Sequence, residues 1–250
     1  MKTVITLDDE KFGGNYYHAA HVEVIRGDKT RSAKYVDVDR LLEAMKNARN
    51  VDVFYRIGRL PQNYYDGTIR RESDMTISGH MLLTVSKQRI PLQFEETKYI
   101  IPFPALLFCF HIIHGRVCST EVYALTGTQW NEKSVLYNFP YGNVNVQSHQ
   151  VCWGSNSLPE ITELRKLDVV CSLFYDSPCN NDYFTAERSV KWKTDNLRNV
   201  LEKLKEKEEF PEKLLVMSDR GNIGTLIKGI IKKEDRNGSI LIFLELQKKN

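Results

Sequence analysis

One cysteine, Cys152, ends a short segment whose residue types suit covalent chemistry. The segment begins with a turn at residues 140–142, has a polar tip at residues 147–150 and returns to the cysteine. The pattern from Ser157 to Glu160 matches a helix capping box, so a helix is expected directly after this loop. The positive end of a helix stabilises a thiolate, which is the nucleophilic form of cysteine.

Asn143 precedes the cysteine across the same loop, and its side-chain amide has the chemistry of an oxyanion donor. The alternative is an inert, packed thiol, because free cysteine is among the most often buried residue types. A cysteine hydrolase would need a histidine base, but all six histidines precede Cys152. His149 lies three positions before the cysteine and is expected on the opposite face of an extended chain. The histidines left for such a base are His18, His21, His111 and His114, of which the last two are expected to be turn residues.

Other patterns in the chain exclude several classes of site. There is no Cys-x-x-Cys or His-x-x-x-His pair, so no zinc site is expected. The segment 221–224 lacks the Lys-Ser/Thr ending of a phosphate loop. A net charge of +3 is too small to argue for binding to nucleic acid or to a membrane.

The N-terminal residues contain no secretory apolar region, and the longest uncharged apolar run, residues 99–115, is short for a membrane-spanning helix. We therefore expect a cytoplasmic protein in which the five cysteines are free thiols.

The elements that must position Cys152 flank it on both sides. Ala105–Ile113 and Val117–Leu125 are apolar runs joined at His114-Gly115, which predicts a buried hairpin in the middle of a sheet. Residues 134–159 carry no charge although they include several aromatic side chains. Such a stretch is either buried or an apolar contact surface.

Apolar periodicity predicts further elements towards both ends. Strands are expected at residues 4–7, 21–25, 51–57 and 81–85; helices are expected from the Asp37 cap to about Asn47, from Ser157 to Phe174, and from Thr194 or Asp195 towards Pro211. The Asn237-Gly238 pair favours a hairpin. We thus expect an N-terminal α+β extension over residues 1–80, a core over 81–210 and a basic C-terminal tail over 211–250.

Three stretches, taken in this order, carry a resemblance: Ile101–Phe108, Leu136–Gly154 and Phe174–Pro178. They resemble the prokaryotic ubiquitin-conjugating-enzyme-like family D, which includes a component of the PRTRC cassette. The likeness runs from about residue 80 to about residue 210. It implies an α+β fold of the ubiquitin-conjugating-enzyme type, with an antiparallel meander sheet and flanking helices.

The resemblance also implies an activity. Cys152 would accept a ubiquitin-like protein as a thioester from a ThiF-like adenylating enzyme and pass it to an amine, in a system that includes a JAB-type metalloprotease. No cofactor or metal is implied for this chain, because ATP is used one step earlier.

Two departures from the family pattern concern the site residues. The spacing from Asn143 to Cys152 is one residue longer than in the family, so Asn145 is a rival for the oxyanion donor. The family has a histidine after the cysteine, where this chain has Asn180 and Asp182. Either residue would orient or deprotonate the attacking amine, or the activity is weak or lost and the chain is a binding scaffold.

Overall fold

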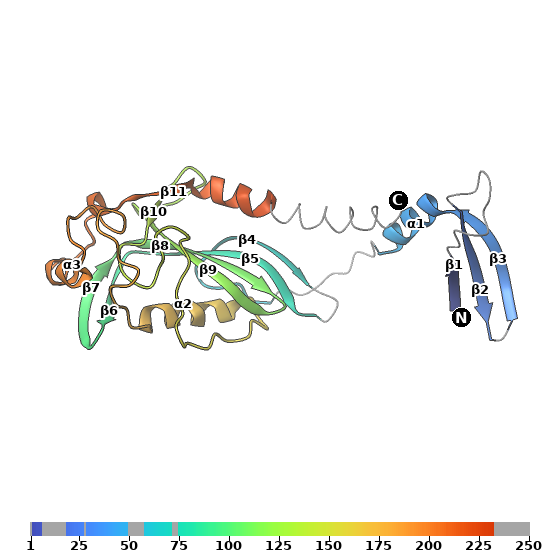
Figure 1. Ribbon diagram of the computed structural model, residues 1–250, viewed down its shortest axis with the longest axis horizontal. Helices are drawn as coiled ribbons and strands as arrows, with labels where there is room; N and C mark the ends of the chain where they lie inside the picture. Colours follow the sequence, from blue (N-terminus) through green and yellow to red (C-terminus); the bar gives the residue numbers. More distant parts are fainter. Residues whose placement is uncertain (1, 7–18, 28, 50–57, 72–74, 233–250) are drawn as a thin grey trace. The chain divides into compact units, whose positions relative to one another are not determined.

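The computed structural model describes residues 2–6, 19–27, 29–49, 58–71 and 75–232 (Figure 1). The chain forms two compact units, Met1–Tyr55 and Arg56–Asn250. The expected boundary at residue 80 therefore falls inside the second unit. The reason is strand pairing, because β4 (Tyr64–Arg71) forms an antiparallel ladder with β5 (Ile77–Val85).

The first unit contains a three-stranded antiparallel sheet and one helix. Strands β1 (Lys2–Thr6), β2 (Ala19–Arg26) and β3 (Lys29–Asp37) are neighbours in chain order, and α1 (Val38–Arg49) follows. Asp37 Oδ1 accepts a hydrogen bond from the Arg40 amide over 3.0 Å, which confirms the predicted cap. The strand expected at residues 51–57 lies outside the described residues.

The second unit is built on a six-stranded antiparallel sheet in the order β11-β10-β9-β8-β5-β4 (Figure 1). Its further strands are β8 (Ala105–Ile113), β9 (Arg116–Leu125), β10 (Val135–Asn138) and β11 (Met217–Asn222). The predicted β8–β9 hairpin is confirmed, and it occupies the centre of the sheet. The architecture is α+β, with the strands arranged as an antiparallel meander.

A separate hairpin, β6 (Gln88–Phe94) and β7 (Thr97–Phe103), is inserted between β5 and β8 and was not predicted. Its strands contain Pro91 and Pro102, which lack the donor that an inner strand needs. The hairpin stays outside the main sheet as a two-stranded ladder.

An aromatic core fills one face of the main sheet. Helix α2 (Leu167–Asp176) packs there, and its Phe174 ring meets the ring of Phe108 edge-on at 5.3 Å. Further buried aromatic residues of this core are Phe103, Phe110, Phe139 and Tyr141. Phe139, Tyr141 and Val144 of the uncharged stretch are buried in this core, whereas its residues 154–157 are exposed. A buried phenylalanine or valine side chain contributes about 1.5–3 kcal/mol.

A short helix packs against part of the opposite face of the sheet. Residues 223–232 are helical, and Ile223 and Ile230 pack in a second apolar cluster with Leu82, Leu107 and Tyr123. Residues 217–222 of the predicted C-terminal tail take part in the main sheet, because β11 pairs with β10. The hairpin expected at Asn237-Gly238 lies outside the described residues. In the part of the chain that the structure describes, no helix is long and apolar enough to cross a membrane.

The helix expected to begin at Ser157 starts later. Residues 156–161 are not helical; a 3-10 turn, η1 (Leu164–Lys166), leads into α2. The reason is tertiary, because the Ile161 amide donates to the Gly115 carbonyl at the β8–β9 turn over 2.7 Å. The next helix, α3 (Leu197–Leu204), is capped by Asn196, whose Oδ1 accepts from the Arg198 amide over 2.9 Å, and it ends well before Pro211.

Candidate active site around Cys152

Cys152 stands exposed at the end of a short extended return. An isolated bridge joins Val144 to Val151, and the Val151 amide donates to the Thr120 carbonyl of β9 over 2.8 Å. The Cys152 amide itself donates to the Asn143 carbonyl over 2.8 Å. The thiol is therefore fixed to the central sheet through its backbone, while its side chain faces solvent.

The expected support from a helix N-terminus is wrong, because α2 begins only at Leu167. Cys152 is not followed by a helix that would place a positive dipole end beside the sulfur.

A groove of about 370 Å³ surrounds the thiol. It brings together all four residues predicted for the site: Asn143, Cys152, Asn180 and Asp182. The rival Asn145 is not among the lining residues. Its side-chain oxygen instead accepts hydrogen bonds from the amides of Gln147 and Ser148 over 2.9 and 3.0 Å, so it stabilises the turn at the loop tip.

The groove has two walls, the loop that ends at Cys152 and the facing loop of residues 177–183, and Asn143 connects them. Its Nδ2 donates to the carbonyl oxygens of Pro178 and Ser177 over 3.0 and 3.3 Å. Its backbone has φ = +69°, a left-handed conformation that asparagine tolerates better than most residues. The amide expected to serve an oxyanion is thus engaged in holding the opposite wall.

Asn180 and Asp182 form a small turn on that wall. Asn180 Nδ2 donates to Asp182 Oδ2 over 2.8 Å, and the Asp182 amide donates back to Asn180 Oδ1 over 3.0 Å. Cys179, directly before the turn, is paired with the β6–β7 hairpin: its amide donates to the Gln93 carbonyl and its carbonyl accepts from the Glu95 amide. The wall is therefore anchored to the hairpin.

Tyr183 is the groove residue that the sequence did not single out. Tyr183 lines the groove together with Cys152, and its interaction with the Cys152 thiol raises the pKa of the Tyr183 hydroxyl. The phenol therefore stays protonated around neutral pH and keeps a donor beside the sulfur. The only sequence signal was its place in the loop that contains Asp182; the contact itself is made between segments far apart in the chain.

Gly142 allows the two walls to approach closely. A Cβ atom at this position would lie 2.6 Å from the Asn180 carbonyl oxygen and 3.1 Å from Cys179 Cβ. Cys179 itself is buried, which raises the pKa of its thiol to about 12, so it remains protonated and unreactive.

In the described ranges, no histidine is placed to act as a catalytic base for Cys152. His149 is 1% exposed, and its Nε2 lies 3.0 Å from Asp219 Oδ1 and 3.2 Å from Ser218 Oγ, which agrees with the expected absence of a Cys–His pair. His114 occupies the β8–β9 turn as expected, whereas His111 is wrong as a turn residue because it lies within β8. Among the described residues no histidine lines the groove; His18 lies outside them.

The electrostatic character of the groove comes from two carboxylates. Glu95 and Asp182 are both among its lining residues, and Glu95 Oε2 pairs at 2.6 Å with Nη2 of Arg198, which does not line the groove. Lysine and arginine are absent from the described lining. The groove is therefore suited to receive a group that carries positive charge or donates hydrogen bonds.

The comparisons with known proteins place these features in a family. The model of the family described as Prokaryotic E2 family D matches residues 75–218, more than half of the chain, and this range includes the whole groove. No curated protein matches the chain, and no solved structure matches it. The chain belongs to prokaryotic E2 family D.

Proposed function

We propose that this protein carries a ubiquitin-like protein as a thioester on Cys152 and transfers it to an amine. The observation that supports the proposal most directly is the exposed thiol in a groove shared with Asn143, Asp182 and Tyr183. Family membership supports a ubiquitin-conjugating-like role in general. The partners in this proposal are the ubiquitin-like protein and a ThiF-like adenylating enzyme.

The first step is an exchange of thioesters. The Cys152 thiolate attacks the carbonyl carbon of the ubiquitin-like C-terminus, which is held as a thioester by the adenylating enzyme. A new carbon–sulfur bond forms to Cys152, and the bond to the donor's sulfur breaks, so the donor leaves as a thiolate. ATP is consumed before this step, and the groove needs no cofactor for it.

The second step is attack by an amine. The carboxylates of Glu95 and Asp182 favour entry of a cationic amine, which loses one proton to solvent and so becomes a neutral nucleophile. Asp182 is the group in the groove that accepts the second proton as the nitrogen attacks. The amine nitrogen forms a bond to the carbonyl carbon, and the bond to Cys152 breaks. Tyr183 donates a hydrogen bond to the sulfur as it leaves with negative charge.

The test is a charging assay with the purified full chain, its adenylating enzyme, ATP and the ubiquitin-like protein. We expect an adduct that reducing agents remove, and we expect Cys152→Ala to abolish it. In Cys152→Ser, an ester that resists reducing agents is expected in place of the thioester. Cys118→Ala is the matched control, because Cys118 is also exposed but does not line the groove.

An adduct of unchanged amount in Cys152→Ala would contradict the proposal. Loss of the adduct in both Cys152→Ala and Cys118→Ala would also contradict it, because the effect would then not be specific to the groove.

A non-catalytic binding role is the second candidate. It is favoured by the engagement of both asparagine amides, since Asn143 donates to carbonyls of the wall and Asn180 donates to Asp182. In that case the wild-type chain would form no adduct, and Cys152→Ala would bind the ubiquitin-like protein or the adenylating enzyme as tightly as the wild type. A pull-down of defined partners alongside the charging assay separates the two roles.

A further inference from the structure

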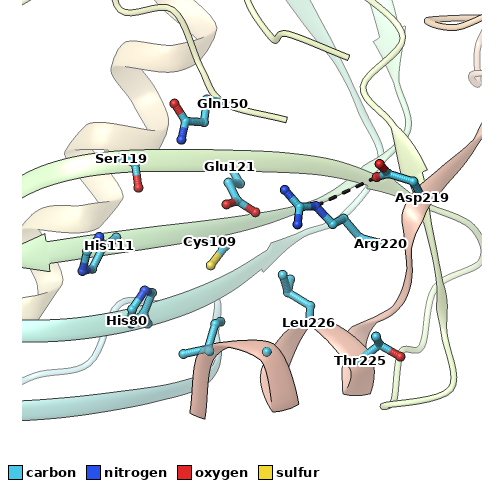
Figure 2. A pocket seen from close by; sticks show the side chains of 12 residues that line it. His80, Cys109, His111, Ser119, Glu121, Gln150, Asp219, Arg220, Thr225 and Leu226 are labelled. Carbon is cyan, nitrogen blue, oxygen red and sulfur yellow. Dashed lines mark ion pairs between the residues drawn. The ribbon is translucent and has the colours of Figure 1, made fainter. Parts of the chain in front are cut away.

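A second cavity, of about 570 Å³, lies on the face of the main sheet that the helix 223–232 partly covers (Figure 2). Its lining comes from β5, β8, β9 and β11, from the loop at Gln150 and from the helix. No described residue lines both this cavity and the groove around Cys152. It is therefore a separate site, which the proposed transfer reaction does not use.

The cavity begins where this face of the sheet changes from apolar to polar. Leu107 and Tyr123 are buried under the helix in the second apolar cluster. Side chains alternate along a strand, so the next residues on the same face are Cys109 and His111 of β8 and Ser119 and Glu121 of β9. An antiparallel sheet can leave one face in contact with water, and His111, Ser119 and Glu121 are only partly buried, so this polar part of the face is accessible to a ligand.

Two stacked rings form one end of the cavity. His80 of β5 and His111 of β8 are cross-strand partners, and their rings lie parallel, with centroids 4.3 Å apart and an interplanar angle of 4°. The next residue in this row is Ser119 of β9, the cross-strand partner of His111. Because neighbouring strands are about 4.8 Å apart, the small Ser119 leaves room for a third ring beside His111.

Hydrogen-bonding groups surround this open position (Figure 2). Glu121 Oε2 accepts from the Tyr123 hydroxyl over 2.5 Å, which fixes the carboxylate, and Gln150 pairs with Glu121 through a backbone bridge. Arg220 extends its guanidinium from β11 into the cavity and is 3.9 Å from Asp219. Within the described ranges, the side chains of Ser119 and Gln150 form no hydrogen bond with the protein, so their capacity is available to a ligand.

We propose that this cavity binds a nucleoside or nucleoside monophosphate. The base lies over Ser119 as the third ring in the stack with His111, since bases stack on aromatic side chains including histidine. Gln150 and Glu121 read its edge, because amides and carboxylates pair with the donor and acceptor groups of bases. Arg220 faces a single phosphate, whereas Glu121 and Asp219 repel a longer phosphate chain.

The size of the cavity agrees with this ligand class, since small-molecule sites commonly measure about 300–1,000 Å³. The proposal does not depend on the role of Cys152.

The test is isothermal titration of the full chain with the four common ribonucleosides, their 5′-monophosphates and ATP. We expect saturable binding of at least one nucleoside and its monophosphate, and weaker binding of the triphosphate. Ser119→Phe places the protein's own ring in the open position and is expected to weaken binding by at least ~10-fold, as loss of a stacking position would. Cys118→Phe adds the same ring to an exposed residue of the same strand that does not line the cavity, and is expected to leave binding unchanged.

Arg220→Ala separates the contribution of the phosphate to the affinity from that of the base. It is expected to reduce the affinity for the monophosphate to that for the nucleoside, while Arg116→Ala, on an exposed residue outside the cavity, has no effect. Absence of saturable binding by every nucleoside and monophosphate up to ~5 mM would overturn the proposal. Unchanged binding in Ser119→Phe would also overturn it. Thermal melting of each variant shows whether the fold is retained.

Discussion

The Asn143 carbonyl accepts a hydrogen bond from the Cys152 amide over 2.8 Å, while the Asn143 side chain donates to the opposite wall at Pro178 over 3.0 Å. One residue thus determines both where the thiol lies and how far away the facing loop stands. This arrangement differs from an oxyanion donor that acts on the reacting carbonyl directly. Asn143 is therefore a positioning residue, and substitutions at Asn143 test this role.

Selective modification of the thiols should follow their burial. We expect iodoacetamide at pH 8 to label Cys152 and Cys118, which are exposed, before the three buried cysteines. Burial raises the pKa of Cys171 and of Cys179 to about 12, so both stay protonated under these conditions. Mass spectrometry of peptides from the native protein gives the order of labelling. Early labelling of Cys179 would contradict the closed packing of the wall against Gly142.

Removal of the Tyr183 hydroxyl should slow reactions at Cys152. Tyr183→Phe keeps the ring but takes away the donor to the sulfur, so we expect native alkylation of Cys152 to slow by about two- to fivefold. The raised pKa of Tyr183 keeps the phenol protonated, so the effect should persist into mildly alkaline solution and disappear only as the pH rises through that raised pKa. Tyr137→Phe, outside the groove, is the control. Equal rates for all three proteins would exclude a contribution from Tyr183.

Substitutions of Asn143 should separate its backbone conformation from its hydrogen bonds. Asn143→Gly keeps the positive φ and loses the two side-chain bonds, at a cost of about 1 kcal/mol. Asn143→Ala adds the strain of a left-handed alanine and should cost about 1 kcal/mol more. Each kcal/mol corresponds to a fall of roughly 2–4 °C in Tm for a unit of this size. If the Tm of Asn143→Gly is lower than that of Asn143→Ala, the positive φ does not determine which residue is tolerated at this position.

The contact of Asp219 with buried His149 should make part of the stability depend on pH. The hydrogen bond from His149 holds the pKa of Asp219 below its ordinary value, so the stabilisation is present above that value and is lost as the pH falls through the lowered pKa. Because the Asp219 side chain is 76% exposed, we expect Asp219→Asn to cost only about 0.5–1 kcal/mol at pH 7.

Thermal melts from pH 7 to pH 3 test this expectation. The difference in Tm between wild type and Asp219→Asn should shrink towards zero at the acidic end. Asp176→Asn, on an exposed residue at the end of α2, should follow the wild type at every pH. If the Tm difference between wild type and Asp219→Asn grows on acidification, the expected loss of stabilisation at low pH is contradicted.

Local patterns predicted the elements whose stability is local or strongly apolar. The β8–β9 hairpin followed from two apolar runs around His114-Gly115, and the α1 cap followed from Asp37. The helix start at Ser157 was wrong because the Ile161 amide pairs with the Gly115 carbonyl, a contact between distant segments. The β6–β7 hairpin was missed because its prolines argue against a strand unless its position outside the main sheet is known.

In the candidate site too, the residues could be predicted from the sequence, whereas their contacts with distant segments could not. Cys152, Asn143, Asn180 and Asp182 were chosen from residue types and family resemblance, and the structure brings them into one groove. The direction of the Asn143 amide and the contact of Tyr183 with the thiol depend on how two separate loops meet, which spacing along the chain does not specify.

The anchoring of Cys179 to the β6–β7 hairpin has a mechanical consequence. One wall of the groove is joined by backbone hydrogen bonds to Gln93 and Glu95, whereas the thiol is joined to β9. Because Phe94, Ile101 and Phe103 of the hairpin are buried in the main apolar core, this wall is held by the packing of the core itself. The distance between the thiol and the facing loop is therefore fixed by the folded core, so a substitution that loosens the hairpin would also disturb the groove.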